Sequence, residues 1–428
     1  MKSSSTARHD PTVLLMVGDT VINPGRSGIQ TVVRSLASAL GAMKANVRPV
    51  VWNNRYNQLR PLPPDASIGL AAENLRDVPG TPLSLLWHPK AWGPWLLNRS
   101  NVSRLPLHQH PGYTDLSAGT WVLMPELIYR DRAAEFIRYA HRRGWKVALI
   151  FHDAIPVQFP EYVPPELPAN HAGYMRAFAQ ADLILPTSTT TDQGWREFMD
   201  KEGLRSPPTR ICSLACDIPG VPRVRTPRED LAPLPGPETP VRMLCVSTLE
   251  PRKNHKTLLA AYELAASARP DLPLELDLVG ARYVDRADIV LAAQALIERY
   301  PGRVRWRERV DHNELNRLYR DCDFTVYPSV LEGFGLPVIE SLWLGRPCVC
   351  ANFSVMAENA AGGGCVTCDV RAPQALADKI IHLAESPQRR RELAHEATTR
   401  PLKTWHEYAL EVLAAMKEES RGTTTAAA

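Results

Sequence analysis

The stretch Tyr327-Pro-Ser-Val-Leu-Glu-Gly-Phe-Gly-Leu-Pro-Val-Ile-Glu340 decides the fold class of this chain. An apolar strand over residues 324–327 ends here in a loop with two glycines, and a helix follows the loop. Pro337 suits the start of that helix, because its missing N–H would have no intrahelical partner there. Gly333 and Gly335 let the backbone amides approach an anion closely. The stretch therefore predicts a strand–loop–helix unit that binds a phosphate-bearing ligand.

Two glutamates belong to the same unit. Glu332 lies at the mouth of the loop and Glu340 one turn into the helix, so we expect both carboxylates to line one cavity. Two acceptors beside an amide-rich loop suit a ligand with both hydroxyls and phosphates, and a nucleotide sugar is such a ligand. The alternative is a tight strand–helix turn with both glutamates in solvent.

The stretch resembles the retaining glycosyltransferases of family 4, whose signature is two glutamates separated by seven residues. Glu332 and Glu340 have that spacing, Pro-Ser precedes it, and Glu-Gly-Phe-Gly-Leu-Pro lies inside it. Residues 314–319 (Glu-Leu-Asn-Arg-Leu-Tyr), residues 345–349 (Gly-Arg-Pro-Cys-Val) and Glu358 also follow the family order. The resemblance implies the B-type glycosyltransferase fold, in which two Rossmann-like domains face each other across a cleft and the last helix crosses back to the first domain.

Length and composition agree with two soluble domains. The 428 residues are enough for two cores, and 44% hydrophobic and 22% charged residues are typical of soluble globular proteins. No apolar run approaches the roughly 20 residues that span a bilayer, and Val13-Leu-Leu-Met-Val17 is too short for a signal-peptide core. We therefore expect a cytoplasmic protein. The net charge of +4 permits attraction to anionic lipids but does not predict nucleic-acid binding.

Alternating strands and helices run through both halves of the chain, which predicts α/β domains with parallel sheets. The expected strands are 13–17, 47–52, 121–124, 146–151 and 181–185, then 243–247, 274–279, 304–306, 324–327 and 348–350. Between the halves, seven prolines over residues 217–240 exclude a helix or a central strand. The expected organisation is an N-terminal acceptor-binding domain (1–216), a linker (217–240), a C-terminal nucleotide-sugar-binding domain (241–400), a crossing helix (401–418) and a disordered tail (419–428).

A cationic loop follows the first strand of the second half. Residues 247–256, Ser-Thr-Leu-Glu-Pro-Arg-Lys-Asn-His-Lys, place Arg252 and Lys253 where a parallel sheet usually binds ligands. Such cations neutralise the charge of a leaving nucleoside diphosphate, and a solvated basic loop is the alternative. The family has a Glu-Pro-Arg-Lys-Asn version of its diphosphate loop, which implies this role for both residues. Many relatives have Arg directly after the strand, where this chain has Ser247 and Thr248.

The first half offers two further candidate segments. Residues 25–30, Gly-Arg-Ser-Gly-Ile-Gln, follow the first strand, and the family's Gly-Ile pair at this place implies that Gly28 approaches the diphosphate. Residues 151–156, Phe-His-Asp-Ala-Ile-Pro, end another strand, where His152 could hydrogen-bond a sugar hydroxyl or be satisfied at a domain edge. The family's active-site histidine falls at His152, and Asp153 would orient its imidazole or face the acceptor.

Two patterns typical of metal sites are not assigned to metals. Asp321-Cys-Asp323 has the D-x-D pattern, but its place before a strand favours a capping and positioning role. In the B-type fold, basic residues and helix dipoles replace the metal, so the resemblance implies no metal and no other cofactor. Cys365-x-x-Cys368 and Cys212-x3-Cys216 have zinc-like spacing without a second ligand pair nearby, so we expect free thiols.

Three tryptophans, Trp87, Trp92 and Trp95, lie among prolines in residues 82–97. They would either pack under a folded loop or form a flap that meets acceptor or membrane, because Trp favours the headgroup boundary. Acceptors of related bacterial enzymes are often polyprenyl-linked. The resemblance therefore implies a saccharide acceptor carried on a lipid, Trp92 near that acceptor, and peripheral contact with the inner face of the plasma membrane.

The expected activity is retaining transfer of a hexose from GDP-mannose or a UDP- or dTDP-sugar, in bacterial O-antigen or exopolysaccharide synthesis. Glu340 would hold the ribose, Lys253 and Arg252 the diphosphate, and Glu332 the donor sugar. The amides expected to assist Glu332 are those of Gly333, Phe334, Gly335 and Leu336. Two alternatives are a nucleotide-sugar epimerase on the same scaffold, which needs no acceptor, and a non-catalytic partner of another transferase.

Overall fold

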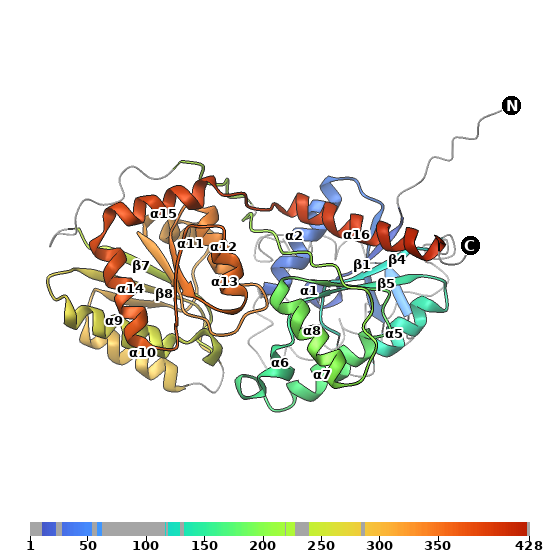
Figure 1. Cartoon of the computed structure of the whole chain (residues 1–428), viewed down its shortest axis with the longest axis horizontal. Coiled ribbons are helices and arrows are strands. Elements are labelled where there is room, and N and C mark those ends of the chain that lie inside the picture. Colours follow the sequence, from blue (N-terminus) through green and yellow to red (C-terminus); the bar gives the residue numbers. More distant parts are fainter. Residues whose placement is uncertain are drawn as a thin grey trace, which may run out of the picture. The chain divides into compact units, whose positions relative to one another are not determined.

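The computed structural model describes residues 11–22, 28–53, 58–61, 116, 119–128, 132–218, 220–226, 239–283 and 287–425. The chain forms two compact units, shown in Figure 1. The N-terminal unit comprises Met1–Leu214 together with Trp405–Ala428, and the C-terminal unit comprises Ala215–Thr404. The described residues of the expected linker belong to the C-terminal unit, where Val224 N–H donates to the Trp343 carbonyl at 3.0 Å.

A six-stranded sheet in the order β3-β2-β1-β4-β5-β6 forms the centre of the N-terminal unit. The strands are parallel except β3, which runs antiparallel to β2. Their apolar residues are buried, as expected for strands covered by helices on both faces. The strands are β1 Val13–Met16, β2 Val47–Asn53, β3 Gln58–Pro61, β4 Trp121–Met124, β5 Lys146–Phe151 and β6 Leu183–Pro186.

Helices cover this sheet, and the longer ones bury apolar residues against it. In α2, Val32, Val33, Leu36 and Leu40 face inward at helical spacing. Helix α5 packs on α7 and β5. The helices are α1 Gly18–Ile22, α2 Gly28–Ala42, α5 Arg132–His141, α6 Ile155–Gln158, the 3-10 turn η6 Pro160–Tyr162, α7 Leu167–Phe178, α8 Thr189–Lys201 and α16 Trp405–Thr425.

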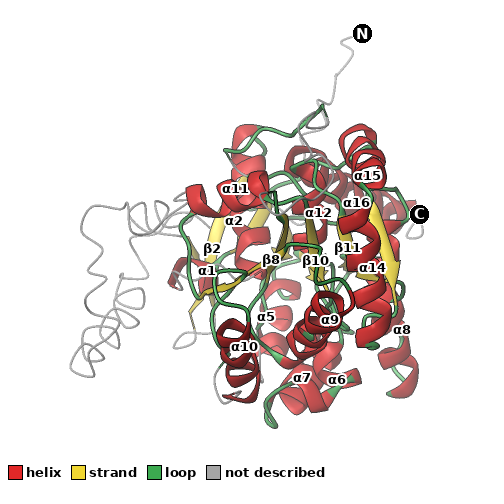
Figure 2. Cartoon of the chain, turned by 90° about the vertical axis from the view of Figure 1, so that its left-hand side faces the viewer, coloured by secondary structure: helices red, strands yellow, loops and turns green. Residues whose placement is uncertain are grey.

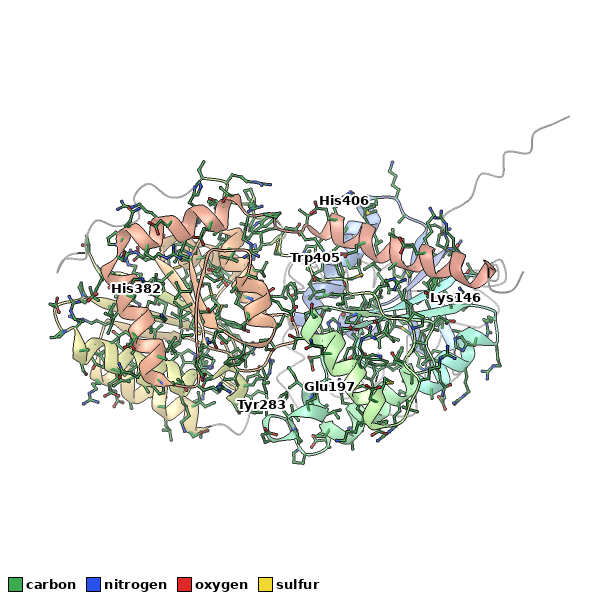
Figure 3. The ribbon with its side chains drawn as sticks, in the orientation of Figure 1. Lys146, Glu197, Tyr283, His382, Trp405 and His406 are labelled. Atoms are coloured by element: carbon green, nitrogen blue, oxygen red, sulfur yellow. The ribbon has the colours of Figure 1, made fainter. Side chains whose placement is uncertain are left out.

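The last helix, α16, returns to the N-terminal unit and packs on α2. Figure 3 labels Trp405 at its start and Lys146 near its end. Trp121 Nε1 donates to Ser420 Oγ at 2.9 Å, and Lys146 Nζ donates to the Glu419 carbonyl at 3.3 Å. Residues 419–425 were expected to lie in a disordered tail, whereas α16 extends to Thr425. Its contacts at Glu419 and Ser420 hold it against β5 and β4. It begins at Trp405 rather than at residue 401.

The C-terminal unit contains a second six-stranded sheet, all parallel, in the order β12-β11-β10-β7-β8-β9. The strands are β7 Val241–Val246, β8 Leu274–Val279, β9 Val304–Arg307, β10 Phe324–Tyr327, β11 Cys348–Ala351 and β12 Cys365–Cys368. The helices are η7 Pro251–Lys253, α9 His255–Ala268, α10 Ala287–Arg299, α11 His312–Asp321, α12 Leu336–Trp343, α13 Ser354–Ala360, α14 Pro373–Glu385 and α15 Pro387–Thr399. Figure 2 shows α9 and α10 on one side of these strands and α11 and α12 on the other.

In both sheets the strand order reverses at one place, between β1 and β4 in the first and between β7 and β10 in the second. Loops that leave the carboxyl ends of parallel strands diverge at such a point, and ligands of open α/β sheets bind there. The expected architecture of two Rossmann-like α/β domains with a returning last helix is confirmed. None of the helices in the described parts of the chain is long and apolar enough to cross a membrane.

Candidate functional site

The loops after β7 and β10 meet in a cluster of charged and hydroxyl side chains around Glu332. Its Oε2 accepts a hydrogen bond from Arg252 Nη1 at 2.9 Å, and its Oε1 accepts one from Lys253 Nζ. The Tyr327 hydroxyl and Ser329 Oγ also donate to Oε1, at 2.7 and 2.6 Å. Lys253 Nζ in turn donates to the Tyr327 hydroxyl at 2.8 Å. Three predicted site residues are thus brought together at one edge of the sheet.

The cluster keeps Glu332 ionised. Its side chain is only 8% exposed, and burial by itself would raise its pKa. The positive charges of Lys253 and Arg252, together with the hydrogen bonds, outweigh burial and lower the pKa of Glu332 to about 2. Arg252 is further shared with Glu250, whose Oε1 lies 2.8 Å from Arg252 Nη2. A phosphate that reaches these two cations would therefore share them with carboxylates.

Backbone geometry fixes the cationic loop against the glutamate loop. The short turn η7 ends at Asn254, which adopts the left-handed conformation (φ 59°) that Asn tolerates better than most residues. The Asn254 side chain donates to the Pro328 carbonyl at 3.2 Å, and the Val330 N–H donates to the Arg252 carbonyl at 2.9 Å. The two loops are therefore hydrogen-bonded to each other rather than held by the ion pairs alone.

The predicted amide loop leads directly into α12. Gly335 has φ +86°, which strains any residue other than glycine, and a Cβ built on it would lie 2.1 Å from Met356 Cε and displace the end of that side chain. Asn359 donates to the Phe334 carbonyl at 2.5 Å, which fixes the loop from α13. The helix begins at Leu336, so the amides of this loop point out of a helix N-terminus, where anions are favoured.

Glu340 lies in the second turn of α12, in surroundings unlike those of Glu332. Its Oε2 is 3.4 Å from the Tyr319 hydroxyl, and burial raises its pKa. Glu340 thus accepts a hydrogen bond from a tyrosine hydroxyl, whereas Glu332 is held by two cations. The two glutamates of the motif are chemically distinct.

Asp323 has the positioning role that its place in the sequence indicates. Its Oδ2 accepts the Arg242 N–H at 2.8 Å, and its own N–H donates to the Arg242 carbonyl at 2.8 Å, which joins β10 to β7. Asp321 is exposed and lies 3.9 Å from Arg317. Within the described residues, no group of three or more His, Cys, Asp or Glu side chains could hold a metal ion.

In the N-terminal unit, His152 follows β5 and is buried. Its Nε2 is 2.8 Å from the Pro125 carbonyl, which can only accept, so Nε2 carries the proton and Nδ1 is an acceptor. Burial lowers the pKa of His152, which favours this neutral ring. Asp153 does not orient the imidazole through Nε2; its Oδ1 instead accepts the Ile155 N–H at 3.0 Å at the start of α6.

The structure gives little information on the remaining candidates of this unit. Gly28 is the exposed first residue of α2. Arg26 and Trp92, with its neighbours Trp87 and Trp95, lie outside the described residues.

Glu126, which no sequence motif indicates, lies directly after β4 in this unit. Its two carboxylate oxygens accept the N–H groups of Asp19 and Thr20 at 2.9 and 2.6 Å. Burial raises the pKa of Glu126 to about 7. The one available sequence signal was a carboxylate directly after a buried strand of a parallel sheet.

Part of this chain is similar to known proteins. Residues 228–400 match the family model described as glycosyl transferases group 1. The O-antigen chain mannosyltransferase B of Escherichia coli is 32% identical over 264 residues, which cover 58% of this chain and 63% of that protein. The match thus spans less than two thirds of the relative's length.

Two solved structures share the fold. Sucrose-phosphate synthase from Thermosynechococcus elongatus aligns with a TM-score of 0.63 at 17% identity, over 97% of this chain and 100% of that chain. Alr3699/HepE from Anabaena, solved in complex with UDP, aligns with a TM-score of 0.55 at 15% identity over the same shares. The segment matched by the family model contains Arg252, Lys253, Glu332 and Glu340. Over residues 228–400, the chain is similar to the group 1 glycosyl transferases.

Proposed function

We propose that this protein transfers a hexose from a nucleotide-diphospho-sugar to a saccharide acceptor, with retention of anomeric configuration and without a metal ion. The observation that carries the proposal is the cluster of Arg252, Lys253 and Glu332 at the reversal of the second sheet, beside the glycine loop of α12. Cations and helix amides suit a diphosphate, and fixed carboxylates suit sugar hydroxyls.

Each residue has a distinct role in the proposal. Lys253 and Arg252 neutralise the charge that develops on the diphosphate as its bond to the sugar carbon breaks. Glu332 and the amides of residues 333–336 bind the hydroxyls of the transferred sugar. Glu340 binds the ribose hydroxyls. The acceptor hydroxyl bonds to the sugar carbon on the face that the phosphate leaves, and the departing phosphate oxygen takes its proton.

Within the N-terminal unit, the proposal assigns acceptor binding to His152. His152 can accept a hydrogen bond from a sugar hydroxyl at Nδ1, because Nε2 already donates to the Pro125 carbonyl. The similarity to an O-antigen mannosyltransferase supports GDP-mannose as donor and a lipid-linked saccharide as acceptor, and with them action at the inner face of the plasma membrane in bacterial polysaccharide synthesis.

A donor-hydrolysis screen tests the proposal. The protein is incubated with GDP-mannose, UDP-glucose, UDP-N-acetylglucosamine or dTDP-rhamnose, and nucleoside diphosphate release is measured with and without EDTA. We expect one donor to be cleaved with EDTA present, and Lys253→Ala to slow release by about 100-fold. Lys256→Ala is the matched control, because its side chain is 59% exposed and pairs only loosely with Asp288 at 3.4 Å. Equal rates for both variants would contradict the assignment, as would release that requires a metal.

A further inference from the structure

Glu126 is a buried carboxylate without a role in the mechanism proposed above. The residue is 4% exposed and lies where the strand order reverses between β1 and β4. Its partners Asp19 and Thr20, 107 and 106 positions away, are in the first turn of α1, whose N–H groups have no intrahelical acceptor. One side chain therefore satisfies two amides of the turn after β1.

Pro125, the residue before Glu126, binds a different segment at the same edge of the sheet. The Pro125 carbonyl accepts the hydrogen bond from His152 Nε2, so consecutive residues bind the turn after β1 and the histidine after β5. The turn is also tied to α2, because Arg34 Nη2 donates to the Thr20 carbonyl at 3.2 Å. Displacing the Pro125–Glu126 peptide would therefore shift both His152 and the turn that leads toward Gly28.

We propose that Glu126 is a positioning residue for the acceptor-binding residues of the N-terminal unit. It fixes the turn after β1 and keeps His152 in place through Pro125. The assignment rests on the proposed function, since His152 faces an acceptor only if the protein is a glycosyltransferase. The site demands two oxygen acceptors. A glutamine would offer one oxygen and one NH₂ group, which would face a backbone N–H donor against donor. An aspartate keeps both oxygens on a shorter stem.

Amide hydrogen exchange of the full-length protein tests the positioning directly. We compare wild type, Glu126→Gln, Glu126→Asp and, as control, Glu166→Gln, an exposed glutamate of the same unit whose side chain caps nothing. Exchange at Asp19 and Thr20 should be roughly tenfold faster in Glu126→Gln, less affected in Glu126→Asp and unchanged in the control. Equal protection in Glu126→Gln and the control would overturn the proposal. If Glu126→Gln does not fold, the comparison of Glu126→Asp with the control decides.

Kinetics separate this inference from the proposed function. With GDP-mannose as donor and octyl α-mannopyranoside as acceptor, Glu126→Gln should lower kcat/KM for the acceptor about tenfold, with partial rescue in Glu126→Asp. The affinity for GDP should not change. Wild-type transfer with an unaffected Glu126→Gln variant would refute the positioning role and leave the function standing. A wild type that cleaves no donor would refute the function, while the exchange result still decides the role of Glu126.

Discussion

Two buried glutamates occupy corresponding places in the two units, each where the strand order of its sheet reverses. Glu332 is held by two cations, and its pKa falls to about 2. Glu126 is held by two backbone amides, and its pKa rises to about 7. Burial acts in the same direction on both, so the difference shows that full charges overcome desolvation and two peptide dipoles do not. At the reversal of its strand order, the C-terminal unit thus holds its glutamate by charge, and the N-terminal unit holds its glutamate by hydrogen bonding.

The largest expected effect comes from removing the charge of Glu332. Glu332→Gln keeps the size of the side chain but leaves Lys253 without its anion and Arg252 with Glu250 alone, and it removes a carboxylate from the donor sugar. We expect transfer to fall by roughly two to three orders of magnitude, compared with about tenfold for Glu126→Gln. Steady-state kinetics of the two variants under one set of conditions measures the ratio. Similar losses would show that the two glutamates are not specialised.

The pH dependence of stability should distinguish the glutamates by sign, beginning with Glu332. Its pKa is lower in the folded protein than its ordinary value of 4.5. It therefore stabilises the fold above pH 4.5, and this contribution, roughly 3 kcal/mol at most, is lost as the pH falls from 4.5 toward 2. Thermal unfolding of wild type and Glu332→Gln between pH 7 and 3 should show midpoints that converge as the pH falls. A constant difference would contradict the ion cluster.

Glu126 should show the opposite dependence. Its pKa is raised from 4.5 to about 7, so its contribution is fully present below pH 4.5 and is lost as the pH rises through 7. The stability of wild type relative to Glu126→Gln should decline between pH 4.5 and 7, by roughly 3 kcal/mol at most. Melting curves at half-unit pH intervals check the sign. A relative stability that rises over this range would mean that the two amides stabilise the ionised carboxylate more than burial destabilises it.

A smaller effect should follow from adding a side chain to the glycine loop before α12 in the C-terminal unit. Gly335→Ala adds a Cβ at positive φ against Met356, whereas Gly302→Ala adds one at φ +77° with nothing within 4 Å. Both should lose about 1 kcal/mol from backbone strain, and Gly335→Ala should lose more from the contact. Only Gly335→Ala should also weaken nucleotide binding, as measured by titration with GDP and UDP. Equal behaviour of both variants would remove the loop from the binding site.

The smallest expected effect concerns α16, the last helix of the N-terminal unit. Ser420→Ala removes the acceptor of Trp121 Nε1 and should cost about 1 kcal/mol. Exchange of amides in the last turns of α16 should accelerate, while transfer kinetics stay at the wild-type level. Unchanged exchange would show that other contacts hold these turns.

The sequence predicted most of the architecture, because the buried strands of a parallel sheet are short apolar runs that alternate with helices along the chain. The strands Trp121–Met124, Lys146–Phe151, Leu274–Val279 and Phe324–Tyr327 have the expected bounds. Two edge strands were missed. Gln58–Pro61 is polar and contains a proline, and Cys365–Cys368, considered as a zinc pattern, is largely half-buried and so lacks a strong apolar run.

The candidate site was predicted where a motif is contiguous and missed where contacts are remote. Glu332 and Lys253 were identified from local patterns, and the structure joins them through an ion pair between loops 79 positions apart. Glu126 has no motif, because its role comes from amides over 100 positions away. The end of α16 was misjudged for the same reason: its polar residues are held by Trp121 and Lys146 of distant strands.

The central claim, that the charged cluster of the C-terminal unit binds the donor diphosphate, is tested most directly by calorimetric titration of GDP and UDP into wild type, Lys253→Ala and Lys256→Ala. We predict that one nucleotide binds the wild type and Lys256→Ala with equal affinity, and that Lys253→Ala weakens its binding by at least roughly tenfold. Unchanged affinity in Lys253→Ala, or no binding of either nucleotide to the wild type, would contradict the account.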